Sequence, residues 1–318
     1  MVMIAVTGGT GFTEKVKEKI RVPTDYGDAY LGILKIAGRK VYLIERHYLL
    51  DVPHRVNYKA NLQALRILNG DADTKKYQTD PIVLYEITAA GRLHESFLPG
   101  HLAILDDVDW DDVNRPMSYS DDGHLLLHAT ITPTFSERLR DILKKSWIET
   151  EDEIKTLYSG TEFEPKCHED GTYFNIQGPA FSTIARENRL RNTVHNPRAI
   201  GQTEVPAIQL ARESNIAIAA IGMCVDHSNF PGAPTVTHAG VMKAVETTAL
   251  ASYKLVEQAI KNTPDNFFDP YFHRALDTAL VKDQVNFKEL HAIRPNLAAI
   301  LAIELIKRDL RDYSNGQN

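Results

Sequence analysis

The sequence predicts an α/β protein, because strand-like apolar runs alternate along the chain with runs whose apolar residues recur at helical spacing. Residues 40–46 and 82–88 are rich in the β-branched and aromatic residues typical of strands, and residues 58–68 between them place leucines on one helix face. A further strand is predicted at residues 173–177. The apolar run 215–225 has the composition of a buried central strand.

The rest of the chain is expected to be mainly helical. Helical spacing covers residues 136–158, after an acidic loop at 106–112, and almost all of the chain from residue 241 onward. The sequence contains no internal repeat, low-complexity tract or long linker. The simplest organisation is therefore one main domain at residues 1–262, with a helical C-terminal extension at residues 263–318 packed on the same domain.

Composition limits the class of protein. With 43% hydrophobic residues among 318, the chain can bury a substantial core. A formal net charge of −6 and a pI near 6.1 argue against a nucleic-acid partner, because duplex binding needs a basic face. Cys167 and Cys224 lie far apart, which predicts no disulfide framework and no cysteine metal site, and suits the reducing cytoplasm. The longest apolar runs, 216–225 and 297–306, are too short to span a membrane.

The N-terminus raises the question of which phosphate group the chain binds. An apolar run at residues 3–6 leads directly into the small-residue turn 7–11, which is how a phosphate-cradling loop begins in dinucleotide-binding folds. A nicotinamide-dependent dehydrogenase or epimerase needs a third glycine where this chain has Glu14, and a Tyr-x-x-x-Lys pair that the sequence lacks. The dehydrogenase alternative is therefore disfavoured, and a different phosphate is the better candidate.

Two further strand ends carry groups that suit an oxyanion. Arg46 and His47 stand at the end of the first of the strands above, where open α/β sheets place ligand-binding groups, and the arginine fork matches phosphate oxygens. Thr88 ends the next strand, and the small residues 89–91 after it are expected to leave backbone amides accessible. Together with the glycine turn, these strand ends predict an oxyanion cradle.

Several motifs follow one another in a distinctive order: GGTGF, IERHY, PHRVNYKANLQAL, EITAAGRLHESFLPG, GTYFNIQGPAFSTIARE, IGQTEVPAIQLARE and IGMCVDHS. Their order and spacing over residues 3–261 resemble those of the trimeric purine nucleoside phosphorylases and methylthioadenosine phosphorylases. The resemblance implies a single α/β domain with a mixed central sheet flanked by helices, and a homotrimer whose neighbouring subunit completes the pocket. The implied reaction is phosphorolysis, in which a purine nucleoside and inorganic phosphate give free base and ribose 1-phosphate without metal or organic cofactor.

The resemblance also gives the polar residues their expected roles. The phosphate-binding positions of the family are occupied here by Thr10, Arg46, His47, Thr88, Ala89 and Thr203. Phosphate would be a co-substrate lying beneath a ribosyl group that develops oxocarbenium character. Asp226 matches the position that protonates the leaving purine at N7, and burial after an apolar strand would raise the pKa of its carboxyl. Asp226 and His47 are the expected catalytic residues.

Base and sugar contacts are implied in the same way. The positions that hold the purine carry Phe181, Ser182, Asp226 and Ser228, and the positions that hold the sugar carry Gln202, His128 and His238. A histidine at position 238 favours a ribose 5′-hydroxyl, whereas Asp226 with Ser182 resembles the methylthioadenosine branch and favours a 6-amino purine. The preferred nucleoside stays open between methylthioadenosine, adenosine and a 6-oxopurine nucleoside.

Four positions depart from the family pattern, namely Tyr48, Gln202, Ala207 and Ser228. Gln202 replaces a methionine under the ribose, Ala207 replaces a glutamate, and Tyr48 replaces a glycine. Ser228 replaces the second aspartate of the methylthioadenosine branch. These changes remodel the base and sugar pockets, so a relative that binds nucleosides without cleaving them is a further alternative. The segment 136–169 exceeds the family length, which suits either a cover over the site or a larger trimer interface.

Overall fold

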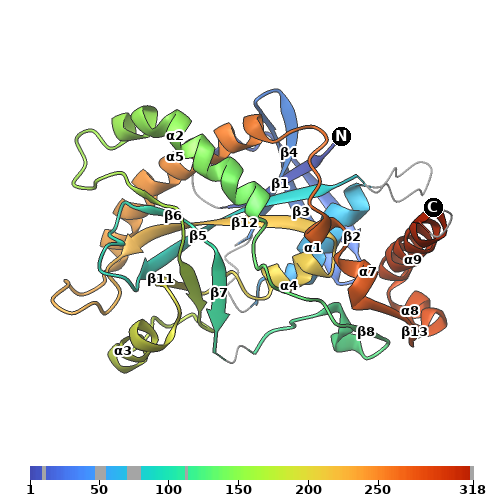
Figure 1. The fold of residues 1–318 in the computed structure, drawn as a ribbon. Helices are drawn as coiled ribbons and strands as arrows, with labels where there is room; N and C mark the ends of the chain where they lie inside the picture. Colours follow the sequence, from blue (N-terminus) through green and yellow to red (C-terminus); the bar gives the residue numbers. More distant parts are fainter. Residues whose placement is uncertain (9–11, 47–54, 70–79, 112–113, 316–318) are drawn as a thin grey trace.

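The computed structural model describes residues 1–8, 12–46, 55–69, 80–111 and 114–315. Of the positions singled out above, Thr10, His47 and Tyr48 lie outside the described residues, and so does the side chain of His238. Within the described chain, one large β-sheet runs through the molecule with helices on both sides (Figure 1). The predicted α/β fold with a mixed central sheet is confirmed.

Strand β5 (Ile82–Arg92) is the centre of the sheet. It pairs in parallel with β1 (Met3–Gly8) on one side and with β12 (Ile216–Asp226) on the other, and its far end pairs antiparallel with β11 (Pro197–Gly201). The other strands of the sheet are β2 (Glu18–Thr24), β3 (Gly27–Ile36), β4 (Arg39–Glu45), β6 (Leu102–Ile104), β7 (Asp107–Trp110), β9 (Cys167–His168) and β10 (Thr172–Asn175). Among the described residues the order is β2-β3-β4-β1-β5-β11-β10-β7, and β12, β6 and β9 branch from β5.

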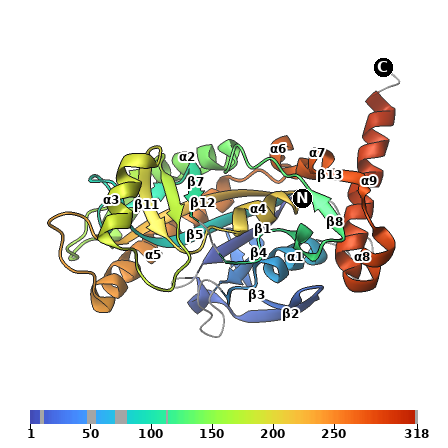
Figure 2. The same cartoon turned by 90° about the horizontal axis from the view of Figure 1, so that it is seen from below.

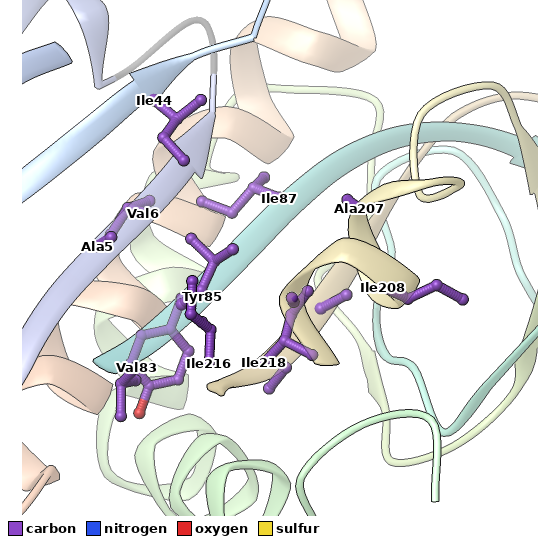
Figure 3. Packing of buried hydrophobic residues seen from close by; sticks show 14 of the residues in the cluster. Ala5, Val6, Ile44, Val83, Tyr85, Ile87, Ala207, Ile208, Ile216 and Ile218 are labelled. Atoms are coloured by element: carbon purple, nitrogen blue, oxygen red, sulfur yellow. The ribbon is translucent and has the colours of Figure 1, made fainter. Parts of the chain in front are cut away.

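Strand β12 is buried from its first residue to Val225. Parallel strands that are covered on both faces carry continuous apolar runs rather than alternating ones, which explains the unbroken series of isoleucines and alanines. Figure 3 shows Ile216 and Ile218 of β12 packed near Val83 and Tyr85 of β5. The central strand predicted at 215–225 is confirmed.

Two pairs of helices cover the two faces of the sheet: α2 (Glu137–Leu157) with α5 (His238–Asn262), and α1 (Tyr58–Leu68) with α4 (Ala207–Arg212). The first pair lies above the sheet in Figure 1, and the second pair lies in front when the molecule is seen from below in Figure 2. Side-chain oxygens of Asn57, Ser136 and Thr237 accept backbone N–H groups at the starts of α1, α2 and α5. The helices predicted at 58–68 and 136–158 are confirmed.

Two expectations about local structure are wrong. The strand predicted at 82–88 continues to Arg92, because residues 89–91 stay paired with β12 instead of turning away from the sheet. The loop predicted at 106–112 contains β7, whose Val108 is buried while its acidic neighbours face outward. The prediction that the chain from residue 241 is almost all helical is confirmed, with β13 (Leu280–Val285), which pairs antiparallel with β8 (Leu125–Leu127), as the exception.

The last helices, α8 (Phe287–Ile293) and α9 (Pro295–Asn315), lie at one end of the molecule, and α3 (Ile184–Thr193) lies at the other (Figures 1 and 2). Short helices α6 (Pro270–His273) and α7 (Ala275–Ala279) precede them. Arg66 of α1 donates to Glu304 of α9 over 2.5 Å, and both side chains are buried. The division of the chain at residue 262 stays a prediction. No helix in the described part of the chain is long and apolar enough to cross a bilayer.

Candidate active site

A cavity of about 300 Å³ opens beside the far ends of β5, β11 and β12. Its walls include Ala89, Gly91, Phe181, Gln202, Thr203 and Asp226. Because β5 and β12 run in parallel, this is the carboxyl-terminal edge of the strands, where open α/β sheets bind their ligands. The cavity is therefore the candidate active site.

The register of β5 against β12 sets the distance between the two polar ends of the cavity. Asp226 pairs with Gly91, and Gly222 pairs with Thr88, three residues earlier on β5. At roughly 3.3 Å per residue, Thr88 and Asp226 are separated by about 10 Å along the strands. A Cβ atom at position 91 would lie 2.8 Å from Asp226 Oδ1, so the glycine makes room for the carboxyl group.

Asp226 is the last residue of β12 and lines the cavity. The backbone N–H of Ser228 donates to Asp226 Oδ1 over 2.6 Å. Burial raises the pKa of the Asp226 carboxyl and outweighs the hydrogen bond from Ser228, which lowers it; the negative charge of Glu187 raises the pKa by a smaller amount. The carboxyl group thus retains its proton to a higher pH than an exposed aspartate and suits a general acid.

A cluster of buried hydroxyl groups adjoins the other end of the cavity, where Thr203 lines the wall. Thr88 Oγ1 lies 2.7 Å from Thr203 Oγ1 and 3.5 Å from the Tyr173 hydroxyl. The backbone N–H of Thr203 donates to the same tyrosine oxygen over 3.3 Å. Thr203 itself reaches the cavity wall, so its hydroxyl is available to an anion bound there.

Arg46 is buried directly behind this hydroxyl cluster, after the end of β4. Its Nη2 donates to the carbonyl oxygen of Ile87 over 3.2 Å and lies 3.7 Å from Glu86 Oε1 and 4.0 Å from Glu204 Oε1. Its Nε has no hydrogen-bond partner among the described residues. A buried donor without a partner is costly, so Arg46 is poised to donate to a bound oxyanion.

Glu86 and Glu204 form a tightly packed pair of buried carboxyl groups beside Arg46. Burial raises the pKa of Glu86 well above its usual range, and the negative charge of Glu204 raises it further. Burial alone would lower the pKa of Arg46, but the two carboxyl groups hold it above its ordinary value. The pair therefore keeps a proton beside a charged guanidinium, which limits the negative charge that faces an incoming anion.

A second cavity of about 360 Å³ adjoins the first, because Val225, Asp226 and Val241 line both. Half of its other wall residues are apolar, namely Pro99, Phe163, Pro234, Val236 and Ala244, and the others include Glu162 and His227. The two cavities together extend from Thr203 to a second compartment beside the start of α5. Within the described residues, no three His, Cys, Asp or Glu side chains are grouped to hold a metal ion.

The geometry at the sheet edge agrees with a comparison against known families. A family model described as the phosphorylase superfamily matches residues 4–261. The chain belongs to this superfamily. An S-methyl-5′-thioadenosine phosphorylase from Thermofilum pendens is 29% identical over 88% of this chain and 99% of its own length.

Other members of the superfamily agree in length and fold. The S-methyl-5′-thioadenosine phosphorylase of Chloroflexus aurantiacus is 30% identical over 87% of this chain and 90% of its own. A probable 6-oxopurine nucleoside phosphorylase of Dictyoglomus turgidum is 31% identical over 82% of this chain and 92% of its own length. The crystal structure of a methylthioadenosine phosphorylase from an antarctic soil metagenomic library superimposes with a TM-score of 0.77 at 23% identity, covering 94% of this chain and 98% of its own. The predicted family is confirmed.

The phosphorylase fold brings most of the predicted base and sugar residues to one cavity. Phe181, Ser182, Gln202 and Ser228 all line it together with Asp226. Phe181 is 67% exposed, as expected for an aromatic side chain at the mouth of an open cavity, and the Ser182 hydroxyl is buried with no partner in the described chain. The Gln202 amide donates to the Ala180 carbonyl oxygen over 3.2 Å, which fixes it across the cavity floor.

One predicted sugar residue, His128, does not line the described cavity walls, and the side chain of His238 lies outside the described residues. His128 is exposed after β8, and its backbone N–H bonds to the Ala279 carbonyl oxygen, away from the cavity walls. His238 is the first residue of α5, and Val241 one turn later lines both cavities, but nothing further is described of the histidine. Thr10 and His47, the remaining phosphate candidates, lie outside the described residues.

Sequence reasoning missed three carboxyl groups, those of Glu86, Glu204 and Glu187. Glu86 interrupts the apolar strand β5, and an acidic residue inside a buried strand is itself a signal of a buried polar partner. Glu204 directly follows the predicted phosphate residue Thr203 and stands near Ala207, where the family has a glutamate. Glu187 carried no local signal, because it lies on the polar helix α3 and is fully buried only by the loop after β12.

Proposed function

We propose that this protein cleaves the N-glycosidic bond of a purine nucleoside with inorganic phosphate, giving free purine and ribose 1-phosphate or 5-methylthioribose 1-phosphate. The observation that carries the proposal is the polarity of one cavity. Thr203, whose hydroxyl bonds to that of Thr88, lines one end, and Arg46 donates to the residue before Thr88. The proton-retaining carboxyl of Asp226 lines the other end. A nucleophilic anion and a leaving base need these two ends on opposite sides of a sugar.

In the proposed reaction a phosphate oxygen attacks C1′ of the sugar while the C1′–N9 bond breaks. The bonding electrons move into the purine, which gains basicity at N7. Asp226 transfers its proton to N7, so the base leaves neutral and the carboxyl becomes a carboxylate. The bound phosphate also stabilises positive charge on the sugar in the transition state.

The phosphate residues hold the nucleophile by hydrogen bonds. Thr203 and Thr88 supply hydroxyl groups, and Arg46 supplies a charged donor whose Nε is free of partners in the described chain. Thr10, His47 and Ala89 complete the set that the family pattern implies. The protonated Glu86–Glu204 pair keeps the site from repelling the anion.

The favoured substrate class is a nucleoside of a 6-amino purine whose sugar carries a 5′-methylthio or a 5′-hydroxyl group. The apolar wall residues of the second cavity suit a thioether, and most of the similar proteins cited above are called methylthioadenosine phosphorylases. One of them is called a probable 6-oxopurine nucleoside phosphorylase, which makes inosine and guanosine the alternative substrates.

The assembly and setting are also proposals. A cytoplasmic homotrimer would let the exposed His128 of one subunit reach the sugar pocket of a neighbour. No metal or organic cofactor takes part in the proposed chemistry, and neither nucleic acid nor a membrane is a partner.

Incubating the purified protein with methylthioadenosine, adenosine, inosine and guanosine, with and without phosphate, tests the proposal. Chromatography should detect free base only in the presence of phosphate, with a 6-amino nucleoside preferred. An Asp152→Asn variant, altered at a fully exposed carboxyl on α2, serves as the control and should match the wild type. Equal release of base without phosphate would replace phosphorolysis by hydrolysis, and no release from any nucleoside would contradict the proposed function.

A further inference from the structure

Ser228 replaces an acidic residue of the family pattern and occupies the cavity wall in an unusual way. Its backbone has a φ of 53°, in the left-handed region, and its N–H donates to Asp226 Oδ1 over 2.6 Å. Its hydroxyl donates to Glu187 Oε1 over 2.5 Å. The left-handed turn therefore points the serine hydroxyl away from Asp226 and toward helix α3.

Glu187 acts as an acceptor toward every partner that surrounds it. Its side chain is fully buried, and its Oε1 accepts from the Ser228 hydroxyl and from Asn229 Nδ2 over 2.8 Å. Its Oε2 accepts from the Asn229 backbone N–H over 2.9 Å and lies 3.5 Å from Arg191 Nη1. Because four donors converge on this carboxylate, the Ser228 proton is committed to Glu187 and only the oxygen lone pairs remain for a ligand.

The wall of the cavity thus presents a proton donor next to a proton acceptor. Asp226 donates in the proposed reaction, and Ser228 Oγ, two residues along the chain, can only accept. A 6-aminopurine shows an acceptor at N7 beside a donor at its 6-amino group, whereas a 6-oxopurine shows acceptors at both positions. The first pattern complements the cavity wall, and the second leaves two acceptors facing each other.

We propose that Glu187, acting through Ser228, selects 6-aminopurines by holding the serine hydroxyl as a hydrogen-bond acceptor. This inference rests on the proposed function, because it assigns the base edge that faces Asp226. Glu187 is a positioning residue, since it is buried behind Ser228 and is absent from the residues that line the cavity. Asn229 Nδ2, which donates to Glu187, also donates to the Ser182 carbonyl oxygen over 2.8 Å. The hydrogen bonds around Glu187 therefore reach both serines of the base pocket.

The first variant is Glu187→Gln, which keeps the shape of the side chain and adds one donor. At the Oε2 position an amide nitrogen would face two nitrogen donors, the Asn229 backbone N–H and Arg191. At the Oε1 position it would face one nitrogen donor, Asn229 Nδ2, together with Ser228 Oγ, which can accept, so we expect it there. The serine would then accept from Gln and be free to donate to a 6-oxo group. The ratio of dissociation constants for hypoxanthine and adenine, measured by calorimetry, should shift toward hypoxanthine by about tenfold.

The second variant, Ser228→Ala, shows whether Glu187 acts through the serine. It should weaken adenine binding by about fivefold to tenfold and leave hypoxanthine binding nearly unchanged. In the Ser228→Ala background, adding Glu187→Gln should shift the ratio no further, because a double-mutant cycle isolates the interaction. Glu151→Gln, at an exposed glutamate of α2, is the matched control and should leave the ratio unaltered.

Free-base binding separates this inference from the proposed function, because it requires no turnover. A wild type that binds hypoxanthine as tightly as adenine would overturn the inference, even if phosphorolysis is observed. If Glu187→Gln lost affinity for both bases equally and had a lowered melting temperature, Glu187 would have a structural role only. That result would also overturn the inference. Selective adenine binding without phosphate-dependent cleavage would support the inference and contradict the proposed function.

Discussion

The proposed phosphate end and the proposed base end of the cavity are built in different ways. At the phosphate end, Arg46, Glu86 and Glu204 are enclosed by the sheet, and charge is balanced inside the protein. At the base end, Asp226 and Ser228 belong to the close of β12 and the loop that follows, and their partners reach them from α3. A charge buried within a sheet is hard to replace, whereas a loop can change its residues. The departure at Ser228 from the family pattern fits this difference.

Removing the cation at the phosphate end should have the largest effect. Arg46→Met leaves the Glu86–Glu204 pair without its neutralising partner, and the free energy of unfolding should fall by about 3–5 kcal/mol. Arg191→Met at the base end is the matched change, because Glu187 keeps three other donors, and it should cost about 1 kcal/mol. Urea unfolding measures both variants. Equal losses would remove the distinction between the two ends.

The second largest effect is expected when the space beside Asp226 is filled. A Cβ atom at position 91 would lie 2.8 Å from Asp226 Oδ1 and 3.1 Å from Ser228 Cβ, so Gly91→Ala should displace the carboxyl group. The expected loss in kcat is at least about tenfold, equivalent to about 1.4 kcal/mol. Gly222→Ala on the paired strand would meet Leu105 at an ordinary 3.5 Å and should retain activity. Steady-state kinetics measures both variants. Full activity in Gly91→Ala would mean that the base end accepts a Cβ atom at position 91 without displacing Asp226.

Removing single hydroxyl groups should affect the two substrates separately. Thr203→Val keeps the side-chain shape but deletes a hydroxyl at the phosphate end, and KM for phosphate should rise about fivefold, or about 1 kcal/mol. Ser182→Ala deletes the unpartnered hydroxyl at the base end and should raise KM for the nucleoside to a similar extent. Kinetics with each substrate varied in turn distinguishes the two. If either variant raised both the KM for phosphate and the KM for the nucleoside, the two ends of the cavity would not act independently.

The smallest expected effect is a change in how stability depends on pH. The raised pKa of Glu86 means that its stabilisation is complete below the ordinary glutamate pKa and is lost as the pH rises through the raised value. Glu86→Gln cannot lose a proton, so its stability should fall less between about pH 5 and about pH 9, by a difference on the order of 1 kcal/mol. Urea midpoints of wild type and variant across this range measure the difference. Parallel pH curves would show that Glu86 is ionised in the native protein.

Local patterns predicted the elements that are regular and buried. The unbroken apolar run of β12 and the helical spacing of α1 and α2 each specify one structure, and each was predicted to within about two residues. Strand β2 was missed because Val22 is its only buried residue and Pro23 interrupts the pattern. The proline is tolerated because β2 is at the edge of the sheet.

The site was predictable only as far as a motif could indicate it. Asp226, Ser182 and Thr203 lie in motifs that resemble those of the family, and all three line the cavity. The contacts of Glu187 with Ser228, and of Glu86 with Arg46, join residues far apart in the sequence, and no local pattern specifies them. Such buried charge pairs depend on how the strands and α3 pack together. Their discovery therefore needed the structure.

The turnover of Asp226→Asn with saturating phosphate and a 6-amino nucleoside tests the central claim most directly. The amide keeps the shape of the side chain but cannot transfer a proton to the leaving base. We predict that kcat falls by about 10²–10⁴-fold while the dissociation constant for phosphate stays unchanged, because phosphate binds at the other end of the cavity. A variant with the kcat of the wild type would contradict the account, since the base would then leave without the proton of Asp226.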